Sequence, residues 1–401
     1  MTVYWIWLSR CRGVGPVLAR SLLEHFGSPE AVYQASETEL ERAGLPAALR
    51  TSLACRELGT AQAILEQCRA AAIRILTLWE DGYPAALRRN RNAPLLLYCR
   101  GVLPDPTLQP WIGVVGARQA DALGLANARL LGWQIAGCGG VVITGMAKGV
   151  DAEAAQGALD RGAAVIGVLG CGADVVYPAE NRALYARVAG QGCLLSEYPP
   201  GVKPNARHFP ARNRIISALS DGVVVVQAAE KSGALITARW AVEQGREVFA
   251  VPGPAGDALS KGCNQLLREG ASLTESGWDV MQTYLCRYPD AVWEDHTLPP
   301  PKTAPDAEAK RTAKSAPGPS DLSDEAPPTR IAAPVCAPAP PLTDDQRAIV
   351  DALRDGPLQL DALIDRVGLS AARVLPQLTL LEIKRIILQK PGKRYEFSGG
   401  F

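Results

Sequence analysis

The sequence predicts an α/β fold in which a parallel sheet is covered by helices on both faces. Short apolar runs alternate with helical stretches from residue 73 to residue 251. Residues 223–226 are apolar throughout, as expected of a strand that is buried on both faces of a parallel sheet. Short loops that contain glycine join the strands to the helices, which is typical of this fold class.

The composition limits the kinds of site that the chain can hold. The formal net charge of the 401 residues is only +1, so a site for a polyanion has to be a local patch of cations. The 10 cysteines include no Cys-x-x-Cys pair and the 3 histidines lie far apart, so we expect neither disulfides nor a metal site. The scattered cysteines fit a reduced, cytoplasmic protein, and no apolar run is long enough to cross a bilayer.

Residues 1–79 are expected to form a helical N-terminal domain of the SAM or helix-hairpin-helix kind, with Ser28 capping one of its helices. Gly13 and Gly15 lie between two helical stretches, which resembles a turn that points backbone N–H groups at a DNA phosphate. Pro16 follows and removes one of these donors, so we favour a plain helical turn. Further helices are predicted around residues 37–45 and 49–72.

Residues 80–295 are expected to form the sheet domain. Apolar runs predict strands within this domain at 95–99, 112–115, 141–144, 164–169, 193–195, 223–226 and 247–251. A further strand is predicted just before the domain, at 75–78. Ligands of such sheets bind at the carboxyl ends of the strands, where the strand order reverses. Glycines follow these strand ends, but their spacing matches neither the dinucleotide-binding fingerprint nor a P-loop, so we expect no nucleotide cofactor.

A cationic segment comes directly before the strand at 223–226. Residues 201–220 contain no acidic residue and hold four cations, Lys203, Arg207, Arg212 and Arg214. Phe209 lies among them, and cations beside an aromatic ring are what a single-stranded nucleic acid needs for phosphate contact and base stacking. Two further cations that follow other strands are expected at the same edge of the sheet, Arg118 and Lys148.

A loop of small residues follows the same strand. Ser232, Gly233 and Ala234 open a helix that is expected to start at Leu235, with Thr237 in its first turn. A helix N-terminus after a strand presents backbone N–H groups and the positive end of the helix dipole, which favours an anion. The loop and the cationic segment together predict a ligand that carries phosphate groups.

Each of these residues also has a structural interpretation, which the sequence alone leaves open. Phe209 would then pack its segment onto the sheet, and Asn213 would hold the backbone of a loop. Arg212 or Arg214 would pair with one of the nearby acids, Glu197, Asp221 or Glu230.

The C-terminal part of the chain changes character twice. Residues 296–342 hold twelve of the 31 prolines and are expected to be a disordered linker. Residues 343–401 predict three helices and a hairpin, the arrangement of a winged helix. Arg373 is the one cation of its third helix, which also contains Pro376, so we do not expect that helix to read a major groove. Cations instead flank the hairpin: Lys384, Arg385, Lys390, Lys393 and Arg394.

Catalytic machinery is not evident. The acidic residues near the strand ends form no pair committed to one reacting centre, and no histidine base lies in these loops. Asp151 is better interpreted as a helix cap, and Ser232 has only Lys231 as a candidate base. We therefore expect a binding protein and no enzyme.

Several motifs occur together in the order found in the DNA-processing protein A family, also called DprA or Smf. They include Gly116-Ala117-Arg118, Gly145-Met146-Ala147-Lys148-Gly149-Val150-Asp151, Tyr177-Pro178-Ala179-Glu180-Asn181, Phe209-Pro210-Ala211-Arg212-Asn213-Arg214 and Ser232-Gly233-Ala234-Leu235-Ile236-Thr237. The chain resembles this family over its whole length except the proline-rich segment. It departs from the family pattern at Ala117, Ala155 and Gln227.

The resemblance implies an extended Rossmann-like domain between a helical domain and a winged helix. It implies sequence-independent binding of single-stranded DNA, loading of the RecA recombinase in natural transformation, and a homodimer formed through the Rossmann-like domain. The residues that it assigns to the DNA strand are Arg118, Arg207, Phe209, Arg212, Asn213, Gly233, Ala234 and Thr237. The charge pattern adds Lys148, Lys203, Arg214 and Ser232 to these candidates.

Two other functions stay open at this point. A nucleotide hydrolase of the phosphoribohydrolase kind uses a related sheet, but it places a glutamate at the start of the equivalent helix, where this chain has none. The chain could also be an interaction protein whose residues 343–401 bind a partner while contact with DNA is incidental.

Overall fold

The computed structural model describes most of the chain. The described residues are 1–295, 297, 343–354, 356–370, 373–374, 377–378, 381, 387–390 and 394–397. Two compact units divide the chain, Met1–Asp306 and Ala307–Phe401, and each is described by itself. Apart from Thr297, the predicted linker at 296–342 lies outside the described residues, and the domain boundaries proposed within the first unit stay predictions.

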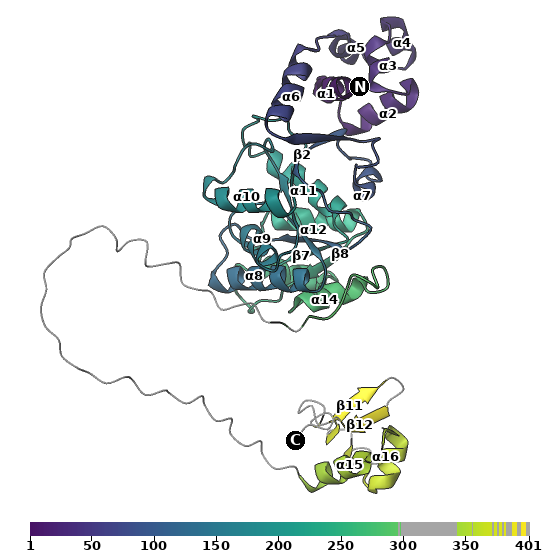
Figure 1. Ribbon diagram of the computed structural model, residues 1–401, viewed down its shortest axis with the longest axis vertical. Coiled ribbons are helices and arrows are strands. Elements are labelled where there is room, and N and C mark those ends of the chain that lie inside the picture. The colour runs from purple at the N-terminus through teal and green to yellow at the C-terminus, as the bar shows by residue number, and fades with distance from the viewer. Residues whose placement is uncertain are drawn as a thin grey trace, which may run out of the picture. The chain divides into compact units, whose positions relative to one another are not determined.

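The first unit begins with six helices, which Figure 1 shows gathered at one end of that unit. They are α1 (Thr2–Arg10), α2 (Pro16–Phe26), α3 (Pro29–Gln34), α4 (Glu37–Arg42), α5 (Ala47–Ala54) and α6 (Gly59–Ala70). The Ser28 side chain accepts a hydrogen bond from the amide of Ala31 at 3.0 Å, which confirms the predicted cap. The helix predicted at 49–72 is instead divided into α5 and α6, because Cys55 adopts a non-helical backbone and its carbonyl accepts a hydrogen bond from Trp7 Nε1.

A sheet of nine strands forms the rest of the first unit. In sequence, they are β1 (Ile73–Thr77), β2 (Leu96–Gly101), β3 (Trp111–Val115), β4 (Val141–Thr144), β5 (Val165–Leu169), β6 (Cys193–Ser196), β7 (Gly222–Val225), β8 (Glu247–Ala250) and β9 (Ser272–Leu273). Their order in space is β1-β2-β6-β5-β4-β3-β7-β8-β9. In this spatial order, the seven strands β6-β5-β4-β3-β7-β8-β9 are parallel to one another. The strands β1 and β2 are antiparallel to each other, and β2 is antiparallel to β6. The mainly parallel sheet predicted from the apolar runs is confirmed.

The direction of the chain across this sheet reverses at β3. Val142 of β4 pairs with Ile112 on one side of β3, and Val224 of β7 pairs with Val114 on the other side. The loops that leave β3 and its neighbours therefore diverge at their carboxyl ends and leave space for a ligand there.

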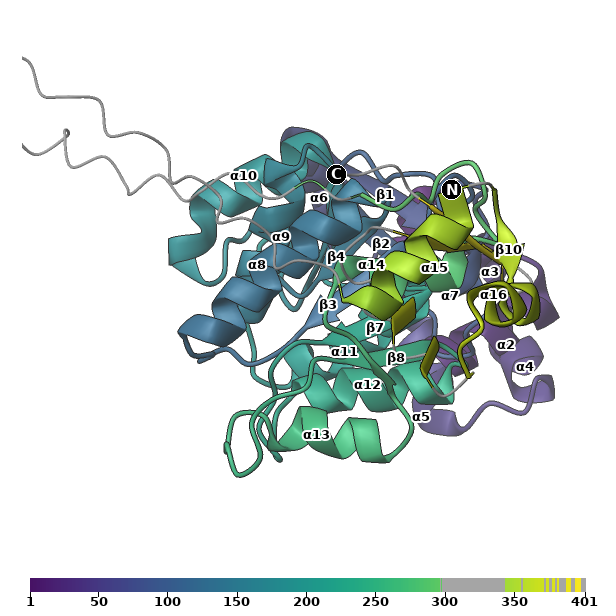
Figure 2. The ribbon, with the colours of Figure 1, turned by 90° about the horizontal axis from the view of Figure 1, so that it is seen from below.

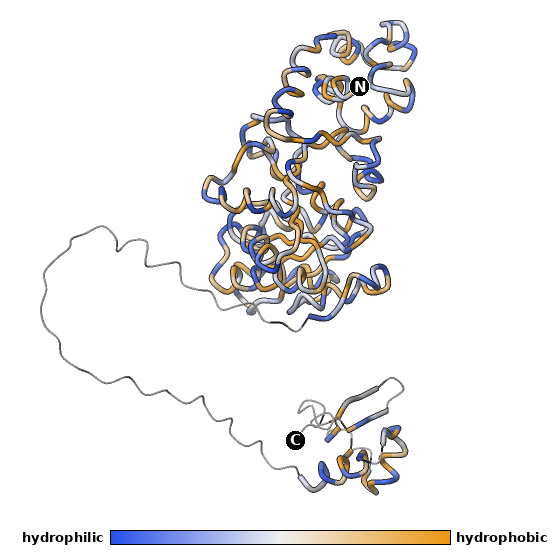
Figure 3. The backbone as a smooth tube through the Cα atoms, viewed as in Figure 1, coloured by the Kyte–Doolittle hydropathy of each residue, from blue (hydrophilic) through white to orange (hydrophobic). Residues whose placement is uncertain are grey.

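Helices cover both faces of the sheet, as Figure 2 shows. One face carries α8 (Ala122–Gly137), α9 (Val150–Asp160), α10 (Arg182–Gln191) and α14 (Gly277–Met281), and the other carries α11 (His208–Leu219), α12 (Ala234–Glu243) and α13 (Lys261–Arg268). Alternate residues of β7 join the two cores: Val223 and Val225 pack with α11 and α12, while Val224 packs on the face of α8 and α9. Figure 3 shows hydrophobic residues concentrated along these central strands.

Three short elements complete the described residues of the first unit. They are α7 (Ala85–Arg88), η1 (Ala179–Asn181) and η2 (Gln282–Tyr284). Within the described ranges, every helix is too short or too polar to span a membrane.

The second unit has its own small core, and its described residues include two of the three predicted helices and the predicted hairpin. The third predicted helix lies partly outside the described residues. The described elements of the second unit are α15 (Asp344–Arg354), β10 (Leu358–Gln359), α16 (Leu360–Val367), β11 (Ile387–Lys390) and β12 (Arg394–Phe397), with strand order β10-β12-β11. Arg373 donates to the carboxylate of Asp345 at 2.7 Å, so this cation has an intramolecular partner. Pro376, Lys384, Arg385 and Lys393 lie outside the described residues, as do the side chains of Lys390 and Arg394.

Candidate nucleic-acid interface

Two loops at the carboxyl edge of the sheet pack directly on each other. One follows β3 and carries Arg118, and the other joins β4 to α9 over residues 145–149. The amide of Val150 donates to the carbonyl of Ala117 at 3.2 Å. Gly149 has φ +77°, and a Cβ there would lie 2.8 Å from the carbonyl oxygen of Arg118, so only glycine fits. The close packing of these loops fixes the backbone that carries Arg118.

Arg118 and Phe209 meet at this edge, although they are ninety-one positions apart in sequence. The guanidinium carbon of the exposed Arg118 lies 5.0 Å from the centre of the Phe209 ring, within range of a cation–π contact. Phe209 is in the first turn of α11, and its Cδ1 would be only 2.9 Å from a Cβ at Gly170, after β5. The missing side chain at Gly170 therefore lets the ring lie against the sheet edge.

A second aromatic ring lies beside Phe209. The ring centres of Tyr177 and Phe209 are 5.4 Å apart with 33° between their planes, and 42% of Tyr177 is exposed. The carbonyl of Tyr177 accepts a hydrogen bond from the Tyr185 hydroxyl at 2.6 Å, which holds its backbone. Tyr177 was not among the predicted site residues, although the motif that begins with it was a visible signal.

Arg212 lies under this surface and not on it. Only 3% of the residue is exposed, and its Nη1 donates to the carbonyl of Gly145 at 2.8 Å and to that of Val168. Burial lowers the pKa of Arg212, and the negative charge of Asp151 opposes this effect. Burial likewise raises the pKa of Asp151, against the positive charge of Arg212. In this structure Arg212 ties the ends of β4 and β5 together, so its predicted contact with DNA is not supported by its position.

Asp151 also has a role different from the predicted helix cap. It is buried in the first turn of α9, and its Oδ2 accepts from the amide of Ala147 at 3.4 Å. Gly149, not Asp151, stands at the N-cap position. Asp151 thus stabilises the loop at 145–149 from the buried side of this loop, next to Arg212.

The start of α12 lies close to α11, as the sequence predicted. The side-chain amide of Asn213 donates to the carbonyl of Gly233 at 3.3 Å, which is the structural role that the sequence left open. Ala234 and Thr237 are buried, whereas Gly233 is exposed and a Cβ there would meet nothing within 4 Å. Of the predicted residues around this turn, Gly233 and the half-buried Ser232 are therefore the ones open to a ligand.

The helix start offers fewer free donors than expected. The amide of Ala234 donates to Ser232 Oγ at 3.3 Å, and the amides of Leu235 and Ile236 donate to the carbonyls of Ser232 and Gly233 at 3.2 Å. These bonds occupy amides that the sequence pattern predicts to be free for an anion. The first turn also contains no acidic residue, so the glutamate expected of a phosphoribohydrolase is missing from this helix start.

The remaining predicted cations fall into two groups. Arg214 forms an ion pair with Glu197 at 2.7 Å and is mostly buried, and Lys148 pairs with Glu180 at 2.6 Å on the surface. Lys203 and Arg207 are exposed, and neither side chain has a hydrogen bond or ion pair to another described residue. The cations free to meet a phosphate at this edge are thus Arg118, Lys203 and Arg207, among the residues predicted.

A known protein family matches the part of the chain that contains the whole candidate interface. The family model for DNA recombination-mediator protein A matches residues 74–285, more than half of the chain. The chain belongs to this family. All twelve residues predicted to contact DNA lie inside the matched region of the chain. A model for the DprA winged helix domain matches residues 332–393, in agreement with the predicted C-terminal fold.

Individual members of the recombination-mediator family resemble the chain over different lengths. Protein Smf of Synechocystis sp. is 32% identical over 401 residues, which cover 98% of this chain and 98% of that protein. DNA processing protein DprA of Streptococcus pneumoniae is 42% identical over 210 residues, or 52% of this chain and 73% of the relative. The X-ray structure of the Streptococcus pneumoniae protein has a TM-score of 0.62 and 34% identity, and it covers 70% of this chain and 98% of its own.

One departure of this chain from the family pattern has a structural explanation. Gln227 follows β7, and its side-chain oxygen accepts from the amide of Asp121 at 3.1 Å, while its carbonyl accepts from the amide of Ala117 at 2.7 Å. A glutamine can therefore hold the loop after β3 as a carboxylate would. In the described ranges, no group of three or more His, Cys, Asp or Glu side chains is placed to bind a metal ion.

Proposed function

We propose that this protein binds single-stranded DNA without sequence preference at the carboxyl edge of its sheet. The observation that carries the proposal is the exposed guanidinium of Arg118 lying over Phe209, with the ring of Tyr177 beside it. Guanidinium groups neutralise phosphates, and aromatic rings stack on any base, so such a surface tolerates every sequence. The DNA-processing role named for the Streptococcus pneumoniae relative agrees with this proposal.

The proposed surface consists of three exposed cations, two rings and a turn. Arg118, Lys203 and Arg207 would contact phosphates, Phe209 and Tyr177 would stack on bases, and the Ser232–Gly233 turn would approach the backbone of the strand. A base that stacks on an aromatic side chain contributes about 1–3 kcal/mol to binding. A duplex keeps its bases stacked on each other, so it cannot use the two rings and should bind more weakly.

Support for the later steps comes from the family and not from the site geometry. We propose that the bound strand is passed to the RecA recombinase during natural transformation, which agrees with the family description as a recombination mediator. We also propose a cytoplasmic location and a homodimer formed through the Rossmann-like domain. RecA filament assembly on strands coated with a single-strand-binding protein, with and without this protein, tests the first of these proposals.

Titration of a fluorescent single strand and a duplex of equal length, at several salt concentrations, tests the proposed function. We expect tighter binding of the single strand and a loss of affinity with salt of about 0.7 in logarithmic slope for each phosphate contacted. Removal of residues 343–401 should leave most of this affinity. If the truncated chain loses all binding, the C-terminal unit carries the contact, as in the interaction-protein alternative.

A separate assay addresses the hydrolase alternative. Base release from nucleoside monophosphates should stay at the level of the blank, because the first turn of α12 carries no acidic residue. Release clearly above the blank, retained when the protein is repurified, would contradict a pure binding role.

A further inference from the structure

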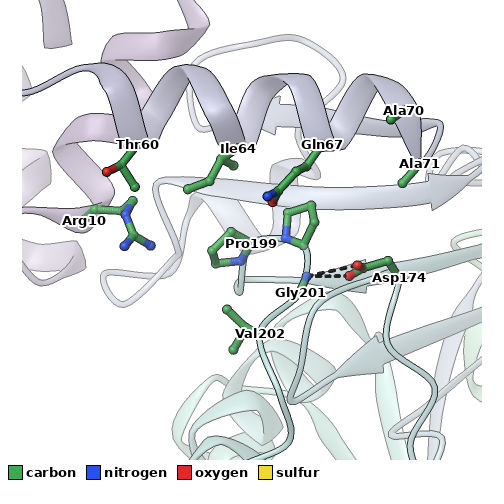
Figure 4. A pocket seen from close by; sticks show the side chains of 11 residues that line it. Arg10, Thr60, Ile64, Gln67, Ala70, Ala71, Asp174, Pro199, Gly201 and Val202 are labelled. Carbon is green, nitrogen blue, oxygen red and sulfur yellow. Dashed lines mark hydrogen bonds between the residues drawn. The ribbon is translucent and has the colours of Figure 1, made fainter.

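An open groove lies between the N-terminal helices and the sheet, beside the proposed interface. Its volume is about 700 Å³. Figure 4 shows Thr60, Ile64 and Gln67 of α6 pointing across it toward the chain at Pro199 and Val202. Arg10, the last residue of α1, lies at one end of the groove, and Asp174 lies at the other. None of the residues that line this groove belongs to the proposed DNA-binding surface.

The groove and the proposed interface share one loop of the sheet. The amide of Gly172 donates to the carbonyl of Val202 at 2.9 Å, so the wall at 199–202 packs on the loop after β5. Gly170 of that same loop packs against the Phe209 ring. The groove wall continues along the chain through the exposed Lys203 and Arg207 to Phe209. The two exposed cations therefore connect the Phe209 ring to the groove along the chain.

The lining suits a nucleotide chain better than a small apolar ligand. Arg10 is exposed, and its side chain has no hydrogen bond or ion pair to another described residue. Thr60 and Gln67 offer hydrogen-bond donors and acceptors that can serve any base, and the half-buried Pro199 offers apolar contact.

One carboxylate lies among the described lining residues, and its charge is partly satisfied. Both oxygens of Asp174 accept from the amide of Gly201, at 2.9 and 3.0 Å. It is also at the end of the groove away from Arg10, as Figure 4 shows. A phosphate next to Arg10 therefore avoids the negative charge of Asp174.

We infer that the groove holds further nucleotides of the same single strand, with a phosphate at Arg10. This inference rests on the proposed function and adds a second segment to its binding site. The helical N-terminal residues then contact DNA through the side of α6 and the end of α1, and not through the Gly13–Gly15 turn. The bound strand runs from Phe209 along Arg207 and Lys203 to Arg10.

Strand length separates the two segments in a binding experiment. A strand of about 5 nucleotides should occupy mainly the Phe209 surface, and one of about 16 should reach the groove. We expect Arg10→Ala to weaken binding of the longer strand by about 3- to 10-fold, to lower its salt slope by about 0.7, and to leave the shorter strand unchanged. Arg42→Ala is the matched control, because Arg42 also ends a helix of the N-terminal domain and is exposed, but does not line the groove.

A second variant tests the groove without removing a charge. Ala70 is exposed on the groove wall, so Ala70→Trp fills space there and should also weaken only the longer strand. Equal affinities of wild type, Arg10→Ala and Ala70→Trp for the longer strand would overturn the inference while leaving the proposed function intact. Failure of wild type to bind either strand would instead overturn the proposed function, and the inference with it.

Discussion

Two arginines at the carboxyl edge of the sheet have opposite environments. Arg118 is exposed and lies over an aromatic ring. Arg212 is buried, with only 3% of the residue exposed, and its guanidinium donates hydrogen bonds to backbone carbonyls. Both belong to motifs of the recombination-mediator family, so a motif cation is not by itself a ligand contact. The comparison teaches that the candidate interface has two layers: an exposed surface layer, to which we assign the ligand contacts, and a buried layer, Arg212 with Asp151, that holds the loops in place.

The largest effect is expected on stability, in the buried layer. Arg212→Met removes the hydrogen bonds to the carbonyls of Gly145 and Val168 and the positive charge that acts on the buried Asp151. The free energy of unfolding should therefore fall by about 3–5 kcal/mol. Denaturant unfolding followed by circular dichroism measures this change. Arg212→Met combined with Asp151→Asn should recover part of the loss, because the double variant buries no single charge. Normal stability of Arg212→Met together with lost DNA affinity would place Arg212 in the surface layer after all.

Arg118→Ala should have the reverse pattern. Its side chain is exposed, so the free energy of unfolding should change by less than about 0.5 kcal/mol. Affinity for a single strand should fall about tenfold or more at low salt, with a shallower salt dependence. Fluorescence anisotropy titrations compare this variant with Arg42→Ala, which removes an exposed charge elsewhere. Equal losses in the two variants would mean that only the overall charge matters.

Tyr177 separates stacking from hydrogen bonding in the surface layer. Tyr177→Ala should lower affinity for a single strand by about 3- to 10-fold, and Tyr177→Phe should keep it, because the ring and not the hydroxyl meets a base. The same titrations measure both variants against a duplex, whose affinity should change little. A loss in Tyr177→Phe equal to that in Tyr177→Ala would assign the contact to the hydroxyl.

The smallest effect is expected for Lys148. Its ion pair with Glu180 is between two half-exposed side chains, and such pairs contribute about 0–1 kcal/mol to stability. Lys148→Ala should therefore lower affinity for DNA less than twofold and leave the unfolding midpoint nearly unchanged. A tenfold loss of affinity would show that Lys148 leaves Glu180 to meet the strand.

The fold could be predicted where burial leaves a pattern in the sequence. The apolar run at 223–226 identified β7, and a helix start expected at Leu235 is observed at Ala234. The strand β9 was missed because its two residues, Ser272 and Leu273, are too few to form a pattern. The break at Cys55 was also missed, since it depends on a hydrogen bond from Trp7, forty-eight positions away.

The sequence predicts which edge of the sheet carries the candidate site, but not which of its residues are exposed and which are buried. Sequence placed Arg118, Phe209 and Gly233 at one edge of the sheet because the carboxyl ends of parallel strands share an edge. It could not show that Arg212 is buried or that Arg214 pairs with Glu197. A sequence gives the charge of a side chain, but not its solvent exposure or its partner in the fold. Tyr177 was overlooked because its position beside Phe209 depends on the path of a loop and not on a periodic pattern.

Photo-crosslinking of an oligothymidine strand, followed by peptide mapping, tests most directly where the strand lies. We predict crosslinks at Phe209 and Tyr177 in the full-length protein, and their loss when Arg118 is changed to alanine. Crosslinks confined to residues 343–401, or to the opposite edge of the sheet, would contradict the account.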